Sequence, residues 1–340
     1  MCDKNINTKG KRIMKKLIAI LMVLFSLLLF SCNSDAQEPT DLPTELQESE
    51  RATVEPTEEP TEEPTEQDEN AIKTMEELAK HDDVVSVKEI SLSDDLSFAS
   101  AYTMIFKSDE LKIVAEIVLP RDYETKGEIY PVMFYFPTVG APIESLARAY
   151  AARGITVVRM YERGLGGSEG VRDFGGEDIA DAQKLIEICD STEFMKDSKM
   201  FVAGASSGSI IAMRLIAEDS ARRLSGCAVS DVISDLKAYA DFRGESIQNI
   251  FAKGIGGTYD EMPEEYEKRS AVSFYQKLDR PMLMIHYGQS PLSQAEQTDR
   301  LYALVKQNNA ACFYKKFDLL ASDFSGDGLT LLVDFIKEFK

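Results

Sequence analysis

Histidine is scarce in this chain, because its 340 residues include only two, His81 and His286. No histidine follows His286. A mechanism that needs a histidine base must therefore use one of these two residues. His81 lies near the N-terminal end of the region that carries regular apolar patterns, and His286 ends an apolar run that reads as a buried strand.

Closely spaced cysteines are also missing. Cys2 and Cys32 fall in the N-terminal segment, and Cys189, Cys227 and Cys312 lie far apart within apolar patterns. An odd number without short spacing forms neither a disulfide framework nor a zinc site. We therefore expect three buried free thiols, and no metal or cofactor.

Basic residues are outnumbered, 38 against 58 acidic residues, which gives a net charge of −20. A chain this acidic repels phosphate backbones, so no nucleic-acid partner is expected. Residues 33–70 hold 14 acidic residues and one base, with a repeated Pro-Thr-Glu-Glu unit between Glu55 and Glu66. Such a segment buries too little apolar area to offset its ordering entropy. Residues 32–70 are predicted to form a disordered tether, and a specific acidic binding site is the alternative.

Only one long apolar run is present, from Leu17 to Phe30, and it is short for a membrane span. Lys11, Arg12, Lys15 and Lys16 precede it, as in a secretory signal. The stretch Leu29-Phe30-Ser31-Cys32 resembles the bacterial lipobox, which implies cleavage before Cys32 and lipid attachment to its sulfur. We expect residues 1–31 to be a lipoprotein signal peptide and the protein to face outward from the cell membrane. An uncleaved anchor is the alternative, and both Met1 and Met14 are candidate starts.

Residues 71–340 carry the pattern of an α/β domain. Strand-like runs at 84–92, 100–106 and 111–119 predict antiparallel strands, the last two joined as a hairpin. Strands and helices then alternate up to a final helix around Leu329–Phe339. The order predicts a mostly parallel central sheet with helices on both faces. Residues 231–280 are irregular and partly helical, and we expect them to form a small cap or lid over a site.

A nucleophile elbow is predicted at Gly204-Ala205-Ser206-Ser207-Gly208. An apolar run precedes this G-x-S-x-G sequence and a helical apolar pattern follows it, which is the context that the motif requires. The glycines permit close backbone contacts at a tight turn, and Ser206 would project above the helix N-terminus.

Several segments together resemble the α/β-hydrolase superfamily, especially its prolyl-oligopeptidase-like and Xaa-Pro dipeptidyl-peptidase-like serine hydrolases. The resemblance spans about residues 82–340. Besides the elbow, it rests on segments in the same order as in that group, namely 151–158, 163–170, Gly256-Gly257-Thr258, Arg269-Ser270 and 280–286. It implies an α/β-hydrolase fold and descent from serine esterases or peptidases.

The same resemblance implies a triad in which Ser206 is the nucleophile, an Asp follows one strand and a His follows the next. Here the Asp position holds Ser290, in His286-Tyr287-Gly288-Gln289-Ser290, and the His position holds Ser322, in Ala321-Ser322-Asp323-Phe324. We interpret His286 mainly as a packing residue.

Other groups could act on Ser206, but each is a weak substitute. Asp231, Asp323 and Asp327 are carboxylates with an ordinary pKa near 4, which makes them feeble bases. Residue 209 is Ser and not the Lys of Ser-Lys enzymes.

The resemblance also assigns an oxyanion site, with the Ser207 N–H as one donor and that of Thr138 or Val139 as the second. Arg163 and Glu169 are expected to make structural ion pairs or backbone hydrogen bonds. The cap segment carries aromatic residues that either line a pocket or, more simply, pack in its core: Tyr239, Phe242, Phe251, Tyr259 and Tyr266.

Two functions remain open at this point. The first is a surface serine hydrolase that acts on an ester, peptide or acyl compound by an impaired or rearranged mechanism. The second is a non-catalytic pseudo-hydrolase that binds a small molecule, peptide or partner protein.

Overall fold

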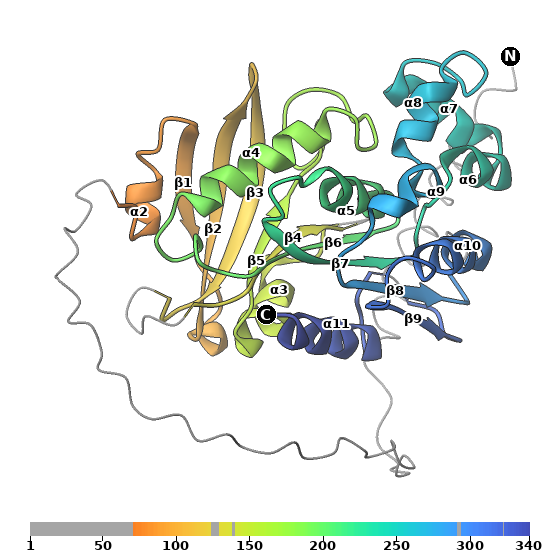
Figure 1. Cartoon of the computed structure of the whole chain (residues 1–340). Helices are drawn as coiled ribbons and strands as arrows, with labels where there is room; N and C mark the ends of the chain where they lie inside the picture. The colour runs from red at the N-terminus through yellow and green to blue at the C-terminus, as the bar shows by residue number, and fades with distance from the viewer. Residues whose placement is uncertain (1–70, 124–128, 138–139, 291–293, 322) are drawn as a thin grey trace, which may run out of the picture. The chain divides into compact units, whose positions relative to one another are not determined.

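A mixed nine-stranded sheet organises the chain, in the order β1-β2-β3-β5-β4-β6-β7-β8-β9 (Figure 1). The computed structural model describes residues 71–123, 129–137, 140–290, 294–321 and 323–340. The predicted signal peptide and tether lie outside these residues. The strands are β1 (Val84–Ile90), β2 (Ala99–Ser108), β3 (Leu111–Pro120), β4 (Val132–Phe136), β5 (Thr156–Met160), β6 (Met200–Ala205), β7 (Leu224–Ser230), β8 (Met282–Tyr287) and β9 (Cys312–Phe317).

The sheet changes from antiparallel to parallel along its width. Strands β1, β2 and β3 pair antiparallel, and β3 also pairs antiparallel with β5. From β5 through β4, β6, β7 and β8 to β9, every neighbouring pair is parallel. The predicted hairpin is confirmed, with Ser108 opposite Leu111. The α/β-hydrolase fold class is therefore confirmed, including its antiparallel N-terminal strands.

Helices cover both faces of the sheet (Figure 1). One face packs against α4 (Asp178–Asp190), α5 (Ser207–Glu218) and α10 (Ala295–Val305), and the other against α3 (Ile143–Ala149) and α11 (Asp327–Glu338). The short helix α2 (Met75–Leu78) has Thr74 as its N-cap, in a capping box with Glu77. The 3-10 turns are η2 (Asp94–Leu96), η3 (Ala151–Arg153) and η4 (Tyr275–Lys277).

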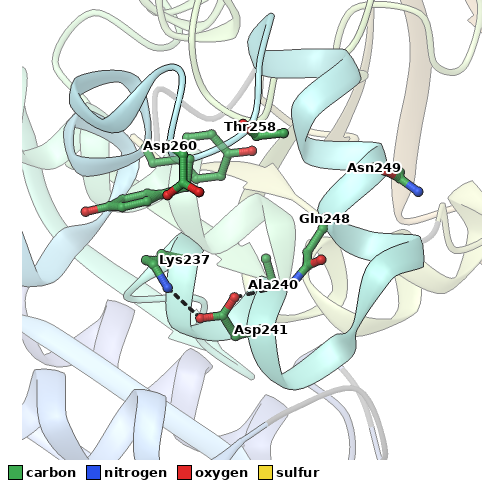
Figure 2. A pocket seen from close by; sticks show the side chains of 9 residues that line it. Lys237, Ala240, Asp241, Gln248, Asn249, Thr258 and Asp260 are labelled. Atoms are coloured by element: carbon green, nitrogen blue, oxygen red, sulfur yellow. Dashed lines mark hydrogen bonds and ion pairs between the residues drawn. The ribbon is translucent and has the colours of Figure 1, made fainter.

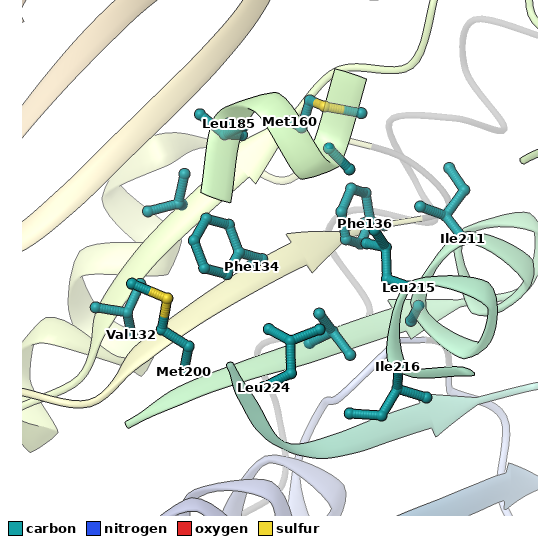
Figure 3. Packing of buried hydrophobic residues seen from close by; sticks show 14 of the residues in the cluster. Val132, Phe134, Phe136, Met160, Leu185, Met200, Ile211, Leu215, Ile216 and Leu224 are labelled. Carbon is teal, nitrogen blue, oxygen red and sulfur yellow. The ribbon is translucent and has the colours of Figure 1, made fainter. Parts of the chain in front are cut away.

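Strand β4 shows how an inner parallel strand is covered on both faces. Phe134 and Phe136 pack toward α4 and α5, where Figure 3 shows them with Leu185 and Ile211. Met133 belongs to the cluster under α3 and α11 on the opposite face. Because successive side chains alternate between two covered faces, every residue of this strand is buried.

Four helices between β7 and β8 form a cap: α6 (Leu236–Arg243), α7 (Glu245–Ile255), α8 (Pro263–Arg269) and α9 (Ala271–Phe274). The cap has its own apolar cluster, which includes Tyr239, Phe251 and Tyr266. Phe174 and Ile210, from the body of the domain, pack in the same cluster. The cap therefore packs directly on α5 and on the loop before α4.

The three cysteines of the domain are buried and free, as predicted. Burial raises the pKa of the Cys312 thiol to about 12, so it is inert near neutral pH. Among the residues that the structure describes, no helix has the length and apolar character needed to span a membrane.

Candidate functional site

The backbone at Ser206 has the conformation of a nucleophile elbow. Ser206 lies between β6 and α5 with φ 49° and ψ −117°, a strained conformation for a residue other than glycine. A Cβ atom at Gly204 would overlap the carbonyl oxygen of Gly208. One at Gly208 would overlap the carbonyl oxygen of Phe136 on β4. Both glycines are thus required because neighbouring backbones occupy the space of a side chain.

Hydrogen bonds hold the backbone of the elbow in place, but none of those among the described residues involves the Ser206 hydroxyl. The Ser206 N–H donates to the Ser230 carbonyl at 3.0 Å. The Ser209 hydroxyl donates to the Ser206 carbonyl at 2.5 Å and accepts from the Ile233 N–H at 3.1 Å. Within the described ranges, no hydrogen bond of the Ser206 Oγ is found. The Ser206 backbone is therefore fixed by hydrogen bonds, whereas none of the described residues is bonded to its hydroxyl as a base would be.

Of the backbone N–H groups predicted to bind an oxyanion, the described residues include only that of Ser207. Ser207 is the first residue of α5, where a helix leaves its N–H groups without intrahelical partners. Thr138 and Val139 lie outside the described residues. The loop that follows them is anchored, because the buried Arg159 donates to the Ala141 carbonyl.

His286 is buried at the end of β8 and lies beside Asp231. Its Nδ1 is 3.7 Å from the Asp231 Oδ1, and both side chains are buried. The Asp231 Oδ1 also accepts the Tyr287 N–H at 3.3 Å. Burial, and then the charge of Lys316, lower the pKa of His286 below its usual range. These contacts agree with a role for His286 in holding the ends of β7 and β8 together.

The segments where the resemblance places the triad partners are tied to the body of the domain. Ser290 is half-buried in the turn after β8, and its N–H donates to the Tyr287 carbonyl at 3.0 Å. Ser322 lies outside the described residues. Asp323, next to it, hydrogen-bonds the buried Tyr135 hydroxyl. Burial, followed by the charge of Asp323, raises the pKa of Tyr135.

Two more contacts hold the loop between β9 and α11. The Ser325 N–H donates to the Tyr287 hydroxyl at 3.2 Å, and this hydroxyl donates to the Ser325 carbonyl at 3.1 Å. Asp327 is the first residue of α11, where a carboxylate interacts favourably with the helix dipole. Asp323 and Asp327 thus both have structural roles.

The Gly-rich loop after β5 is held by the ion pair and backbone contacts that its sequence predicted. The Arg163 Nε and Nη2 donate to the two oxygens of Asp181 at 2.7 and 2.8 Å. The Glu169 carboxylate accepts the Lys112 N–H at 2.8 Å, which joins the loop to β3. Asp181 is fully buried, so this pair lies in the interior.

Arg172 contacts the elbow, and no pattern in the sequence indicated this contact. Its Nη2 donates to the Ser207 hydroxyl at 2.5 Å. Its Nε and Nη2 also donate to the buried carboxylate of Glu162, at 2.5 and 3.1 Å. The residues are separated by ten and 35 positions in sequence, and no motif spacing connects them.

A pair of aspartates joins this loop to the cap. Asp178 is fully buried, hydrogen-bonds Asp173 and accepts the Arg163 N–H at 3.0 Å. Burial, and then the charge of Glu162, raise the pKa of Asp178 to about 8. Asp173 carries the negative charge of the pair, and backbone N–H groups at Gly176 and Glu177 stabilise that charge. Arg269 of α8 donates to the Asp173 carbonyl at 3.1 Å.

The cap carries a cavity of about 290 Å³, shown in Figure 2. The Lys237 ammonium lies 2.7 Å from an Asp241 oxygen and 5.3 Å from the centre of the Tyr259 ring. The sequence singled out five aromatic residues of the cap. Tyr239, Phe251 and Tyr266 are buried in its core, and Phe242 is exposed. Tyr259 and Tyr266 line this cavity. Over the described part of the chain, no cluster of side chains is suited to hold a metal ion.

Comparisons with known proteins agree with this geometry. Residues 145–312 match the model of the prolyl oligopeptidase family. The uncharacterized peptidase YtmA of Bacillus subtilis (strain 168) is 29% identical over 191 residues, which cover 54% of this chain and 71% of the relative.

Solved structures share the fold at low identity. The esterase Pf2001 of Pyrococcus furiosus aligns with a TM-score of 0.56 and 14% identity, over 74% of this chain and 96% of the esterase. A puromycin hydrolase aligns with a TM-score of 0.62 and 18% identity, over 74% of this chain and 40% of the hydrolase. This chain thus spans less than half of that larger enzyme.

Proposed function

Because this chain is a serine peptidase- or esterase-like α/β-hydrolase related to the prolyl oligopeptidase family, we propose that it keeps the ligand site of these enzymes without their usual turnover. In this proposal Ser206 marks the site, and the positions of the triad Asp and His are held by Ser290 and Ser322. The ligand is a small molecule or a peptide that contacts the elbow.

The observation that carries the proposal is the placement of the last histidine. His286 is 2% exposed, lies at the end of β8 and contacts Asp231, and the 54 residues after it contain no histidine. A serine hydroxyl needs a base within hydrogen-bond reach before it attacks a carbonyl.

The other groups considered as a base for Ser206 have contacts of their own. Asp323 bonds the Tyr135 hydroxyl, Asp231 accepts from the backbone of β8, and the Ser209 hydroxyl is bonded to the Ser206 carbonyl. Removing triad residues from an enzyme of this type costs roughly 10⁴- to 10⁶-fold in turnover. Rapid hydrolysis by the usual relay is therefore not expected.

A slow hydrolase is the second candidate, and the backbone at Ser206 favours it. The positive φ at this serine costs about 1–3 kcal/mol, and such strain is commonly associated with active sites. Retention of the strained turn agrees with residual attack by Ser206 on a reactive acyl compound.

A labelling experiment separates the two candidates. We expect the wild-type protein and Ser206→Ala to hydrolyse p-nitrophenyl acetate at equal rates, and neither to react with a fluorophosphonate probe, because Ser206 has no base. A triad esterase run in parallel is the positive control. Labelling of wild type within minutes that is lost in Ser206→Ala would establish the slow hydrolase and contradict the non-catalytic function.

We also propose that the protein acts at the outer face of the cell membrane, held by lipid on Cys32 and lifted by the 32–70 tether. The basic residues, apolar run and Leu-Phe-Ser-Cys stretch of the N-terminal segment support this. Growth with an alkyne fatty acid should label wild type, and Cys32→Ser should abolish the label and release the protein from membranes. A Cys32→Ser protein that stays membrane-bound would instead indicate an uncleaved anchor.

A further inference from the structure

Arg172 presents a fixed positive charge beside the elbow. Its side chain is 29% exposed, and its Nη2 is bonded to the hydroxyl of Ser207, the residue after Ser206. Consecutive Cα atoms are about 3.8 Å apart, so this guanidinium lies at the elbow and not at a distant surface.

One edge of this guanidinium is occupied and the other is open. The Nε and Nη2 edge is bonded to Glu162, which is buried, and the carbon of the guanidinium is 4.7 Å from the centre of the Phe174 ring. These contacts restrict the rotamers of the side chain. In the described part of the chain, no residue accepts a hydrogen bond from Nη1. The arrangement presents the two Nη1 donors in a set direction.

Two features bring positive potential to the elbow, the Arg172 guanidinium and the N-terminus of α5. Glu162 pairs with the Nε and Nη2 edge of Arg172. The charge of Asp173, the next residue, is stabilised by Arg269 and by the backbone N–H groups of Gly176 and Glu177, so neither carboxylate occupies Nη1. The N-terminus of α5, which begins at Ser207, adds positive potential at the same place. A singly charged carboxylate fits this site better than a doubly charged phosphate, because Glu162 and Asp173 already place negative charge beside Arg172.

We propose that Arg172 binds a carboxylate group of the ligand at the elbow, so that the site takes acidic acyl compounds or peptides with a free carboxylate close to the group over Ser206. This inference rests on the proposed function, because it concerns the ligand of the same site. The open Nη1 group donates to the carboxylate, while Glu162 and Phe174 keep the guanidinium in place. Arg172 is thus a specificity residue.

The test compares two ligands that differ only in charge. N-acetylphenylalanine and its neutral amide are titrated calorimetrically into the full-length protein in detergent, at low and at high salt. We expect the acid to bind at least about tenfold more tightly than the amide, because a charge-assisted hydrogen bond contributes about 1.5–3 kcal/mol. High salt should reduce the difference.

Variants assign the difference to Arg172. Arg172→Met should abolish the preference for the acid, and Arg172→Lys should retain part of it. Arg148→Met, which removes an exposed arginine paired with Asp95 elsewhere, should leave it unchanged. The comparison of two ligands within one variant cancels a general loss of stability, which a melting temperature measures separately.

Equal affinity of the wild type for acid and amide, failure of both to bind, or a preference that survives in Arg172→Met would overturn the inference. Failure of the proposed function has a different signature. In that case the protein would show hydrolysis that depends on Ser206. Substrates with a free carboxylate would still be preferred over neutral ones, and this preference would still depend on Arg172.

Discussion

Gly208→Ala is expected to lower the free energy of unfolding by about 3–5 kcal/mol, because the added Cβ meets backbone that has no room to move. The atom in its way is the Phe136 carbonyl oxygen, at the end of a buried strand paired with β6. Relief requires β4 and α5 to separate, and both belong to the largest apolar cluster of the domain. Urea unfolding followed by circular dichroism measures the loss.

Gly140→Ala is the matched control for this substitution. The nearest atom to a Cβ at Gly140 is a Tyr161 ring carbon at 3.7 Å, an ordinary contact, and Gly140 has no positive φ. The control should change stability by less than about 1 kcal/mol. If Gly208→Ala were as stable as Gly140→Ala, the close approach of α5 to β4 at the elbow would be wrong.

Asp178→Asn and Asp181→Asn are expected to change stability in opposite directions, although the two acids lie one turn apart on α4 and are both fully buried. Asp181 is the buried partner of Arg163, so Asp181→Asn leaves this guanidinium, among the described residues, only the exposed Asp109 at 3.5 Å and should cost about 3 kcal/mol. The charges of Glu162 and Asp173 act on Asp178, which also accepts the Arg163 N–H. The charge of Arg269 acts on Asp173. An amide at 178 can donate to Asp173 as the protonated carboxyl does.

The size of the Asp178→Asn effect depends on pH. Its pKa is about 8 in the folded protein and near 4 in an unfolded chain, so its stabilising contribution is complete below pH 4 and lost as pH rises to 8. Asp178→Asn removes this loss, and should raise the free energy of unfolding by as much as about 5 kcal/mol at pH 8.5, since each of about four pKa units corresponds to about 1.4 kcal/mol, and by little at pH 4.5. Melting curves across this range check it. A benefit that is equal at both pH values, or a destabilisation at pH 8.5, would contradict the buried proton on Asp178.

Much of the fold could be predicted from the sequence because the signals were local. Alternating apolar patterns located the first strands to within a few residues, since the run at 84–92 is observed as Val84–Ile90 and that at 111–119 as Leu111–Pro120. The final helix, expected around Leu329–Phe339, is observed as Asp327–Glu338. The elbow was also local. Glycines at 204 and 208 around Ser206 specify a tight turn wherever a strand and a helix flank them.

The contacts around the site could not be predicted, because they join residues that are distant in sequence. Asp323 bonds Tyr135 across 188 positions, and Ser207 bonds Arg172 across 35. A hydroxyl, a guanidinium or a carboxylate has many possible partners in an unfolded chain. Only the packing of the loops at the carboxyl ends of the strands selects one of them.

The sequence by itself determined the order of strands and helices, the strained turn at Ser206 and the absence of any histidine after His286, because composition and short-range sterics need no tertiary context. The tertiary structure decided which charges meet. It buried Asp178 beside Glu162 so that a carboxyl keeps its proton near neutral pH, and it brought the Arg172 guanidinium to the residue next to Ser206. Both outcomes follow from burial and from distances between remote residues, which desolvation and Coulomb energies depend on and which no local pattern of residues contains.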